Sequence, residues 1–156
     1  MSVVQPIIRE AVPQDAALIS ELVAQYWAFE EIDGYCAEDV AKLLSDALAA
    51  PDHVRCWLAE RNGVLLGYLL TVLLFSLEHR GVMAEVDEFF VVPDARGTGV
   101  SASLLEQAER ELAARGIVRL QLQLGVTNAV GRAFYKRNGY AQRSGYEIWD
   151  KPMAVV

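Results

Sequence analysis

A short loop containing two glycines is the segment of this sequence best suited to bind an anion. The apolar run that ends at Val92 leads into Pro93 and a turn, and the turn leads directly into an amphipathic helix predicted over 101–115. A helix start presents unpaired N–H groups and the positive end of the helix dipole, which together attract phosphate. Gly97 and Gly99 have no side chains to hold a phosphate away from those amides. Many similar turns bind no ligand, and that is the alternative here. If this turn does bind one, the sequence predicts a phosphate loop made of Arg96, Gly97, Thr98, Gly99, Val100 and Ser101.

Carboxylates on the strand before this loop could supply a general base. The strand predicted over 82–92 contains Glu85, Asp87 and Glu88. Since side chains alternate between the two faces of a strand, Glu85 and Asp87 are predicted to share the face of Val91, with Glu88 on the other face. Two carboxylates on one half-buried face raise each other's pKa. The alternative is that one of them pairs with a basic side chain or binds a substrate ammonium group.

The elements that must position these residues follow from hydrophobic periodicity. Apolar residues at helical spacing predict four helices. The first begins at Pro13, and the others extend over 37–50, 101–115 and 129–138. Alternation and turn signals predict strands over 7–11, 54–61, 64–75, 82–92, 119–126, 140–142 and 146–151. Asn62-Gly63 is a strong hairpin signal between the second and third of these strands. The order of elements predicts an α/β fold, a mixed sheet covered by helices, in a single domain over 1–156.

Composition and charge exclude several classes of protein. The chain has 156 residues, 53% of them hydrophobic, and a mean hydropathy of +0.20, so a disordered chain is excluded. The net charge of −7 disfavours binding along a nucleic-acid backbone, and no apolar run approaches the roughly 18 residues that span a bilayer. The first residues lack the basic and apolar regions of a signal peptide. Cys36 and Cys56 form neither a disulfide framework nor a metal-ligand spacing, so we expect a cytoplasmic protein without a metal. For the reasons of charge and hydropathy given above, we also expect no nucleic-acid partner and no membrane partner.

Two motifs in the second half of the chain resemble those of the GNAT family of N-acetyltransferases. The segment RGTGVS, residues 96–101, is similar to the family's pyrophosphate loop, Arg/Gln-x-x-Gly-x-Gly/Ala, but ends in a bulkier serine. The segment NAVGRAFYKRNGY, residues 128–140, is similar to the family's second signature, N-x-x-A-x-x-x-Y-x-x-x-G-F, with Gly131 at the alanine position. The order of predicted elements fits as well, so the resemblance extends over residues 7–151.

The resemblance implies a fold and a co-substrate. The fold is a mostly antiparallel, twisted sheet flanked by helices, and the co-substrate is acetyl-CoA, whose pantetheine arm pairs with backbone near Val91 and Val92. Asn128 and Gly131 would lie beside the pantetheine, although Asn128 is also the favoured N-cap of the helix that follows. Tyr135 stands where the family has its general acid, which protonates the departing CoA thiolate. The alternative for Tyr135 is packing of its ring against the sheet.

An acidic stretch earlier in the chain indicates the class of acceptor. The resemblance places the first two helices and the loop between them along the acceptor cleft, and residues 27–39 carry five carboxylates among aromatic side chains. With Glu85 and Asp87 opposite, these groups would attract cations. The alternative is that the acids only face water. We expect a small, positively charged amine to be bound by Trp27, Glu30, Glu31 and Tyr35.

The residues and the resemblance together predict an N-acetyltransferase in which the amine attacks the thioester directly. The base is Asp87 or Glu85, at offsets where family members carry a catalytic Glu or His, and the acid is Tyr135. The rival interpretation is a non-catalytic acyl-CoA-binding or regulatory domain with the same fold. Retention of the tyrosine and of both carboxylates favours the enzyme. We expect the enzyme to be a homodimer.

Overall fold

The computed structural model describes residues 4–154. In chain order its elements are β1 (Ile7–Glu10), α1 (Ala16–Phe29), α2 (Ala37–Leu48), β2 (Val54–Arg61), β3 (Val64–Ser76), β4 (Gly81–Val91), α3 (Val100–Ala114), β5 (Leu120–Leu122) and α4 (Ala129–Arg137). The four predicted helices are confirmed, the first of them beginning as a 3₁₀ turn at Pro13–Asp15. Within residues 4–154, no helix combines the length and apolar character needed to cross a membrane.

The chain divides into two compact units, Met1–Gln123 and Leu124–Val156. The first unit holds the sheet, in the order β1-β2-β3-β4-β5, and neighbouring strands are antiparallel except for β4 and β5. The hairpin between β2 and β3 turns at Asn62 and Gly63, whose φ angles of 52° and 77° fit the type I′ turn that this dipeptide favours. The predicted mixed sheet, mostly antiparallel and flanked by helices, is confirmed.

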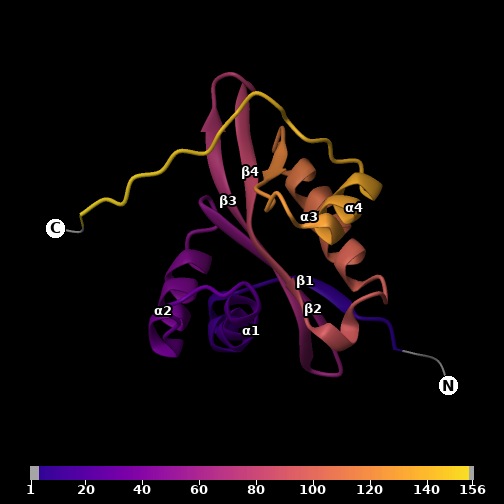
Figure 1. Cartoon of the computed structure of the whole chain (residues 1–156). Coiled ribbons are helices and arrows are strands. Elements are labelled where there is room, and N and C mark those ends of the chain that lie inside the picture. The colour runs from indigo at the N-terminus through magenta and orange to yellow at the C-terminus, as the bar shows by residue number, and fades with distance from the viewer. Residues whose placement is uncertain (1–3, 155–156) are drawn as a thin grey trace. The chain divides into compact units, whose positions relative to one another are not determined.

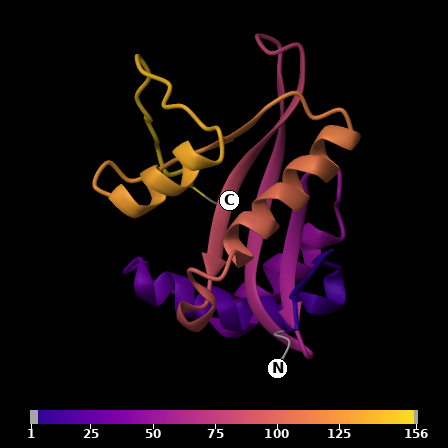
Figure 2. The ribbon, with the colours of Figure 1, turned by 90° about the vertical axis from the view of Figure 1, so that its right-hand side faces the viewer.

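Helices cover both faces of the sheet in the first unit. The pair α1 and α2 lies on one side of the sheet (Figure 1), and α3 crosses the other side (Figure 2). Ile19 of α1 and Leu44 of α2 pack in one cluster with the fully buried Tyr68 of β3. On α3, Leu104 and Leu112 are buried. The sheet is therefore the middle layer of three, and each of its faces has its own hydrophobic contacts.

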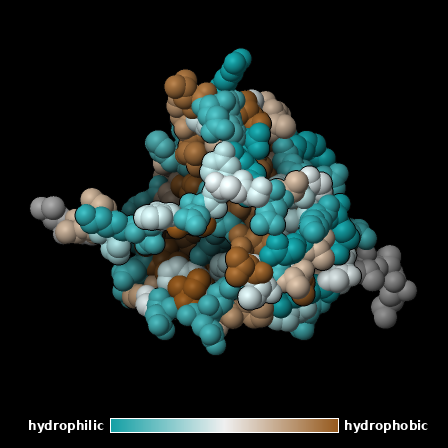
Figure 3. All heavy atoms as spheres, turned by 45° about the horizontal axis from the view of Figure 1, so that its top comes forward, coloured by the Kyte–Doolittle hydropathy of each residue, from teal (hydrophilic) through white to brown (hydrophobic). Residues whose placement is uncertain are grey.

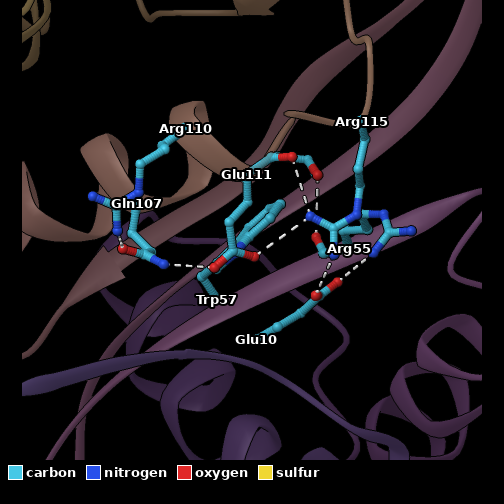
Figure 4. Close-up of polar contacts among 8 residues, drawn as sticks. Glu10, Arg55, Trp57, Gln107, Arg110, Glu111 and Arg115 are labelled. Carbon is cyan, nitrogen blue, oxygen red and sulfur yellow. Dashed lines mark hydrogen bonds and ion pairs between the residues drawn. The ribbon is translucent and has the colours of Figure 1, made fainter. Parts of the chain in front are cut away.

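A polar network fastens α3 to the first two strands. Glu10 of β1 accepts hydrogen bonds from Arg55 at 2.6 Å and from Arg115 at 2.9 Å. Glu111 of α3 accepts a bond at 3.0 Å from Nε1 of Trp57 (Figure 4). Trp57 is fully buried, so its indole N–H requires such an acceptor. The network holds in place the helix that begins at the predicted phosphate loop.

Hydrophobic side chains remain exposed near the turn between β3 and β4. Phe75 is 70% and Leu77 is 81% exposed. Figure 3 shows hydrophobic atoms, in brown, at the surface around this hairpin among hydrophilic ones. Pairing of β2 with β3 ends at Val54 and Val72, so β2 does not extend along this end of the hairpin.

Beyond β4 the strands are shorter than predicted. The strand predicted over 119–126 is present only as Leu120–Leu122. Residues 140–151, predicted as a closing pair of strands, form no strand in the part of the chain that the structure describes, and Tyr146 and Trp149 there are 70% and 86% exposed. A strand requires a neighbour to bond its N–H and C=O groups, which alternation of side chains alone cannot provide. The predicted closing pair is wrong.

Candidate active site

The turn between β4 and α3 has the geometry of an anion-binding loop. Gly97 and Gly99 have φ angles of 72° and 88°, in the left-handed region that other residues rarely adopt. A Cβ atom at either position would meet nothing within 4 Å, so the space beside them is open. Gly99 is the N-cap of α3, whose first N–H groups have no acceptor within the helix. Since Thr98 Oγ1 donates to the main-chain O of Ala95 at 2.6 Å and Val100 is buried, the turn is held from within.

The Arg96 side chain points from this turn toward the end of α1. Its Nε donates to the main-chain O of Val91 at 2.9 Å. Its guanidinium carbon lies 5.1 Å from the ring centre of Phe29, the last residue of α1, and 5.5 Å from that of Phe90 in β4. The sequence assigned Arg96 to the phosphate loop without indicating where its side chain lies. In the structure the guanidinium group contacts aromatic rings and a main-chain carbonyl.

One edge of β4 is open at the end nearest the loop. The N–H of Val92 donates to Leu66 O of β3 at 2.8 Å, so the N–H and C=O of the preceding residue, Val91, point away from β3. On that other side β5 pairs with β4 only along Ala84–Val86. From Asp87 onward, β4 has no strand neighbour there among the described residues. An extended ligand could add to this edge as a further strand, as the resemblance predicts for pantetheine.

A β-bulge changes the faces of the three strand carboxylates. Leu70 of β3 pairs with Glu88, but the next residue, Thr71, pairs with Val86, so Asp87 is an extra residue in β4. Glu85 pairs with Val72. Because Leu70 and Val72 are two residues apart on a regular strand, their partners Glu88 and Glu85 lie on one face. The alternation predicted from sequence, with Glu85 on the face of Val91 and Glu88 facing away from Glu85, is wrong because the bulge inserts one residue.

Glu88 is the centre of a hydrogen-bonded group that the sequence analysis missed. Its carboxylate accepts a bond at 2.6 Å from Tyr68 Oη and another at 2.6 Å from Trp27 Nε1. Tyr68 is fully buried, so its hydroxyl needs a partner inside the protein. Burial and the charge of Glu88 raise the pKa of Tyr68 far above its usual range. These residues lie far apart in sequence, so no local pattern indicated that they would meet.

The two carboxylates predicted as bases have different surroundings. Glu85 accepts hydrogen bonds from Gln121 Nε2 at 2.6 Å and from Gln123 Nε2 at 3.1 Å. Asp87 keeps access to solvent, but partial burial raises its pKa above the usual range, and the negative charge of Glu85 raises it further. Glu85 is already held by two amide donors, whereas Asp87 keeps access to solvent and a raised pKa, so Asp87 is the better candidate of the two.

Carboxylates from α1 and β4 gather around Tyr26. Burial raises the pKa of this tyrosine to about 12, and the negative charges of Glu30, Glu88 and Asp87 add to the effect. Its ring packs on Phe90, with the ring centres 5.7 Å apart. Glu30, directly after α1, and the two β4 carboxylates, separate in sequence, thus all act on Tyr26 on the α1 side of the sheet, where the guanidinium of Arg96 is a neighbouring cation.

The four predicted acceptor-binding residues divide into two pairs. The rings of Trp27 and Tyr35 meet edge to face, with centres 6.1 Å apart, and Tyr35 Oη donates to the main-chain O of Ser20 at 2.9 Å. Their polar tips are therefore bound to neighbouring protein groups. Glu30 and Glu31 are exposed just after α1, and Glu31 has a φ of 56°. In this set of four, therefore, the two glutamates are the exposed residues, whereas the polar groups of Trp27 and Tyr35 are bonded within the protein.

The second unit carries the residues of the second predicted signature. Asn128 is the N-cap of α4, and its side chain accepts a bond at 2.8 Å from the N–H of Gly131. A Cβ at position 131 would lie 2.8 Å from Asn128 Nδ2, so glycine there makes room for the cap. The Tyr135 ring lies edge to face with that of Tyr140, with centres 5.4 Å apart. The capping role of Asn128 is confirmed.

The two cysteines are free, one exposed and one buried. Burial raises the pKa of the Cys56 thiol above its usual range, which keeps it protonated and a poor nucleophile. Among residues 4–154, no group of three His, Cys, Asp or Glu side chains is placed to hold a metal ion. The candidate site in the first unit therefore consists of main-chain amides, carboxylates, aromatic rings and the guanidinium of Arg96.

Most of the chain matches a known family. Residues 19–140 match the profile of the Acetyltransferase (GNAT) family. The chain belongs to the GNAT family. The match includes both motifs on which the predicted resemblance depends, and it extends over parts of both units. GNAT enzymes use acetyl-CoA as co-substrate, and this protein is accordingly an acetyl-CoA-dependent N-acetyltransferase.

Individual relatives and solved structures agree with the GNAT assignment. The chain is 36% identical to the IAA acetyltransferase of Azospirillum brasilense, over 90% of this chain and 86% of the relative. It is 32% identical to the aminoalkylphosphonate N-acetyltransferase of Salmonella typhimurium, over 86% of this chain and 84% of that protein. The crystal structure of a predicted acetyltransferase with acetyl-CoA from Clostridium acetobutylicum has a TM-score of 0.78 at 18% identity, covering 93% of this chain and 96% of its own, and shows the same fold.

Proposed function

We propose that this GNAT enzyme transfers the acetyl group of acetyl-CoA to the primary amine of a small, cationic acceptor. The observation that carries this proposal is the gathering of Glu30, Asp87 and Glu88 around Tyr26. Carboxylates gathered in this way produce a negative potential that concentrates cations and speeds their encounter with the protein. The exposed Glu31 adds to the same field.

The proposed CoA site begins at the open edge of β4 and ends at the start of α3. The pantetheine lies along this edge beside Val91 and Val92, as an added strand would. Because the N–H of Val92 bonds β3 and the O of Val91 accepts from Arg96, the N–H of Val91 is the main-chain group that is proposed to face the ligand. The pyrophosphate is held by the N–H groups of residues 97–101, where the left-handed glycines leave open space; the N–H of Arg96 donates instead to the O of Pro93. Asn128 and Gly131 are further proposed CoA-binding residues, as the family motif implies.

In the proposed mechanism the neutral amine nitrogen attacks the carbonyl carbon of the thioester. Asp87, or Glu85, takes the proton of the acceptor ammonium, directly or through a water molecule. As the C–N bond forms and the C–S bond breaks, the electron pair of the C–S bond passes to sulfur, and Tyr135 Oη donates a proton to the departing thiolate. The acetylated nitrogen releases its extra proton to water, which leaves a neutral amide, and Tyr135 regains a proton from solvent. The N–H of Val91, on the open edge, polarises the thioester carbonyl.

Acetylation of a panel of amines tests this function. Release of CoA thiol is measured with spermidine, lysine analogues and aminoglycosides, and with neutral and acidic amino acids, at low and high salt. We expect cationic acceptors to be preferred and their advantage to shrink as salt increases. The variant Glu30→Gln should weaken this preference, whereas Glu106→Gln, which removes an exposed carboxylate from α3 on the opposite face, should leave it unchanged. Preference for an acidic acceptor would refute the proposal.

The binding of CoA itself is a separate test. A ligand that binds only the folded state raises the melting temperature, by an amount that grows with its concentration. We expect CoA to stabilise the protein in this way. An unchanged melting temperature at millimolar CoA, together with no heat of binding in calorimetry, would remove the basis of the CoA site.

Three further properties are part of the proposal. Both units, residues 1–156, act as one catalytic domain, since the family match extends over parts of both. The free cysteines favour a reducing, cytoplasmic setting.

The enzyme is a homodimer, and the exposed Phe75 and Leu77 are candidate contact residues. Light scattering of the wild type and of Phe75→Ser tests the dimer; a monomeric wild type would refute it.

A further inference from the structure

Arg96 physically connects the proposed CoA loop with the proposed acceptor side. It lies between the 3₁₀ turn Pro93–Ala95 and the glycines of the loop, yet its guanidinium group stacks on Phe29 at the end of α1. The same side chain donates from Nε to the O of Val91, on the open edge of β4. One side chain therefore contacts the last residue of α1 and the strand edge on which CoA is proposed to lie.

Arg96 is an important packing partner of Phe29. Phe29 is 64% exposed, so it has little other packing, whereas the second ring under the guanidinium, Phe90, is only 5% exposed. Phe90 also packs on Tyr26, the tyrosine on which the three carboxylates act. Holding a long, rotamer-rich arginine in this position costs conformational entropy. Anything that immobilises the loop lowers that cost.

We propose that Arg96 is a positioning residue that couples occupation of the CoA loop to the order of the end of α1, rather than a ligand of the pyrophosphate. This inference rests on the proposed function, because it takes the loop as the CoA site. When CoA fixes the main chain at residues 96–101 and at Val91, it fixes both the main chain from which the Arg96 side chain extends and the Val91 O to which its Nε donates. The guanidinium then holds Phe29 with a smaller entropic cost, and the residues after α1, which include Glu30 and Glu31, become more ordered.

Two main-chain hydrogen bonds report on the order of this segment. The N–H of Glu30 donates to Tyr26 O at 2.9 Å, and the N–H of Ile32 donates to Trp27 O at 2.8 Å. Hydrogen–deuterium exchange of these two amides measures how often the end of α1 opens. The measurement needs only CoA, so it does not depend on knowing the acceptor.

The experiment combines calorimetry of CoA binding with exchange measured with and without CoA. In the wild type we expect CoA to slow exchange at Glu30 and Ile32 by about fivefold or more, a typical size for coupling between sites. In Arg96→Gln we expect the CoA dissociation constant to change by less than about threefold, since the loop binds through its amides, and the slowing to disappear. Arg110→Gln is the matched control: it removes an exposed arginine of α3 that pairs with Gln107, and it should behave as the wild type.

The other outcomes separate the alternatives. If Arg96→Gln weakens CoA binding about tenfold or more while CoA still slows exchange in the variant, Arg96 is a phosphate ligand and the proposal is wrong. CoA binding to the wild type without slower exchange overturns the coupling alone. Absence of CoA binding in the wild type overturns both the coupling and the proposed function. Phe29→Leu, which leaves Arg96 in place, should also abolish the slowing without weakening CoA binding, and it keeps the test valid if Arg96→Gln does not fold.

Discussion

Gly67 of β3 allows β4 to approach closely beside the proposed CoA edge. It pairs with Val91 across the two strands. A Cβ atom at position 67 would lie 2.6 Å from the main-chain O of Phe90 and 2.9 Å from Val91 Cγ2. Both distances are well below van der Waals contact, and the shorter one involves a main-chain atom that cannot rotate away. Gly67→Ala must therefore push β3 and β4 apart at the residue where pantetheine is proposed to pair.

The size of the effect follows from this geometry. Forcing an extra methyl group into a packed site costs about 1–3 kcal/mol. A chain of this length loses about 2–4 °C of Tm per kcal/mol, so Tm should fall by about 2–12 °C. Displacement of Val91 should also raise the CoA dissociation constant about fivefold, the equivalent of one lost hydrogen bond of about 1 kcal/mol.

Scanning calorimetry and CoA titration of the variant measure both effects. Gly125→Ala is the matched control, because a Cβ at position 125 would meet nothing within 4 Å. That change should be neutral or stabilise the protein by about 0.4–1 kcal/mol. A Gly67→Ala protein that melts and binds CoA like the wild type would show that the close approach of the two strands is not needed, and the reasoning would be refuted.

Three other substitutions test separate parts of the site. Tyr135→Phe should lower kcat by about 10²–10⁴-fold with little change in CoA affinity, measured by thiol release and calorimetry; wild-type rates would return Tyr135 to a packing role. The pKa of Asp87 is raised in the folded state, so its stabilising contribution is present at low pH and is lost as pH rises through that pKa. Asp87→Asn should therefore raise Tm near pH 7 but not near pH 3, while lowering activity; an equal change of Tm at both values would contradict this. Trp27→Phe removes a donor to Glu88 and should cost about 1.5–3 kcal/mol in urea unfolding, whereas an unchanged midpoint would mean that the bond contributes nothing.

The sequence by itself determined the features that depend on a few neighbouring residues. The Asn62-Gly63 turn and the N-cap at Asn128 follow from local backbone preferences, and the structure has both. The left-handed glycines Gly97 and Gly99 likewise mark the loop at the start of α3. The motifs that identify the GNAT family are of this local kind, which is why they could be read before the fold was known.

Tertiary structure decided which side chains meet. Alternation predicted opposite faces for Glu85 and Glu88, but the bulge at Asp87 arises from pairing with β3 and places them on one face. The bond from Trp27 to Glu88 joins residues 61 positions apart. The Arg96 side chain, in the turn before α3, lies over the ring of Phe29 at the end of α1. Local propensity acts over a few residues, whereas these arrangements depend on packing between distant segments, which only the complete fold determines.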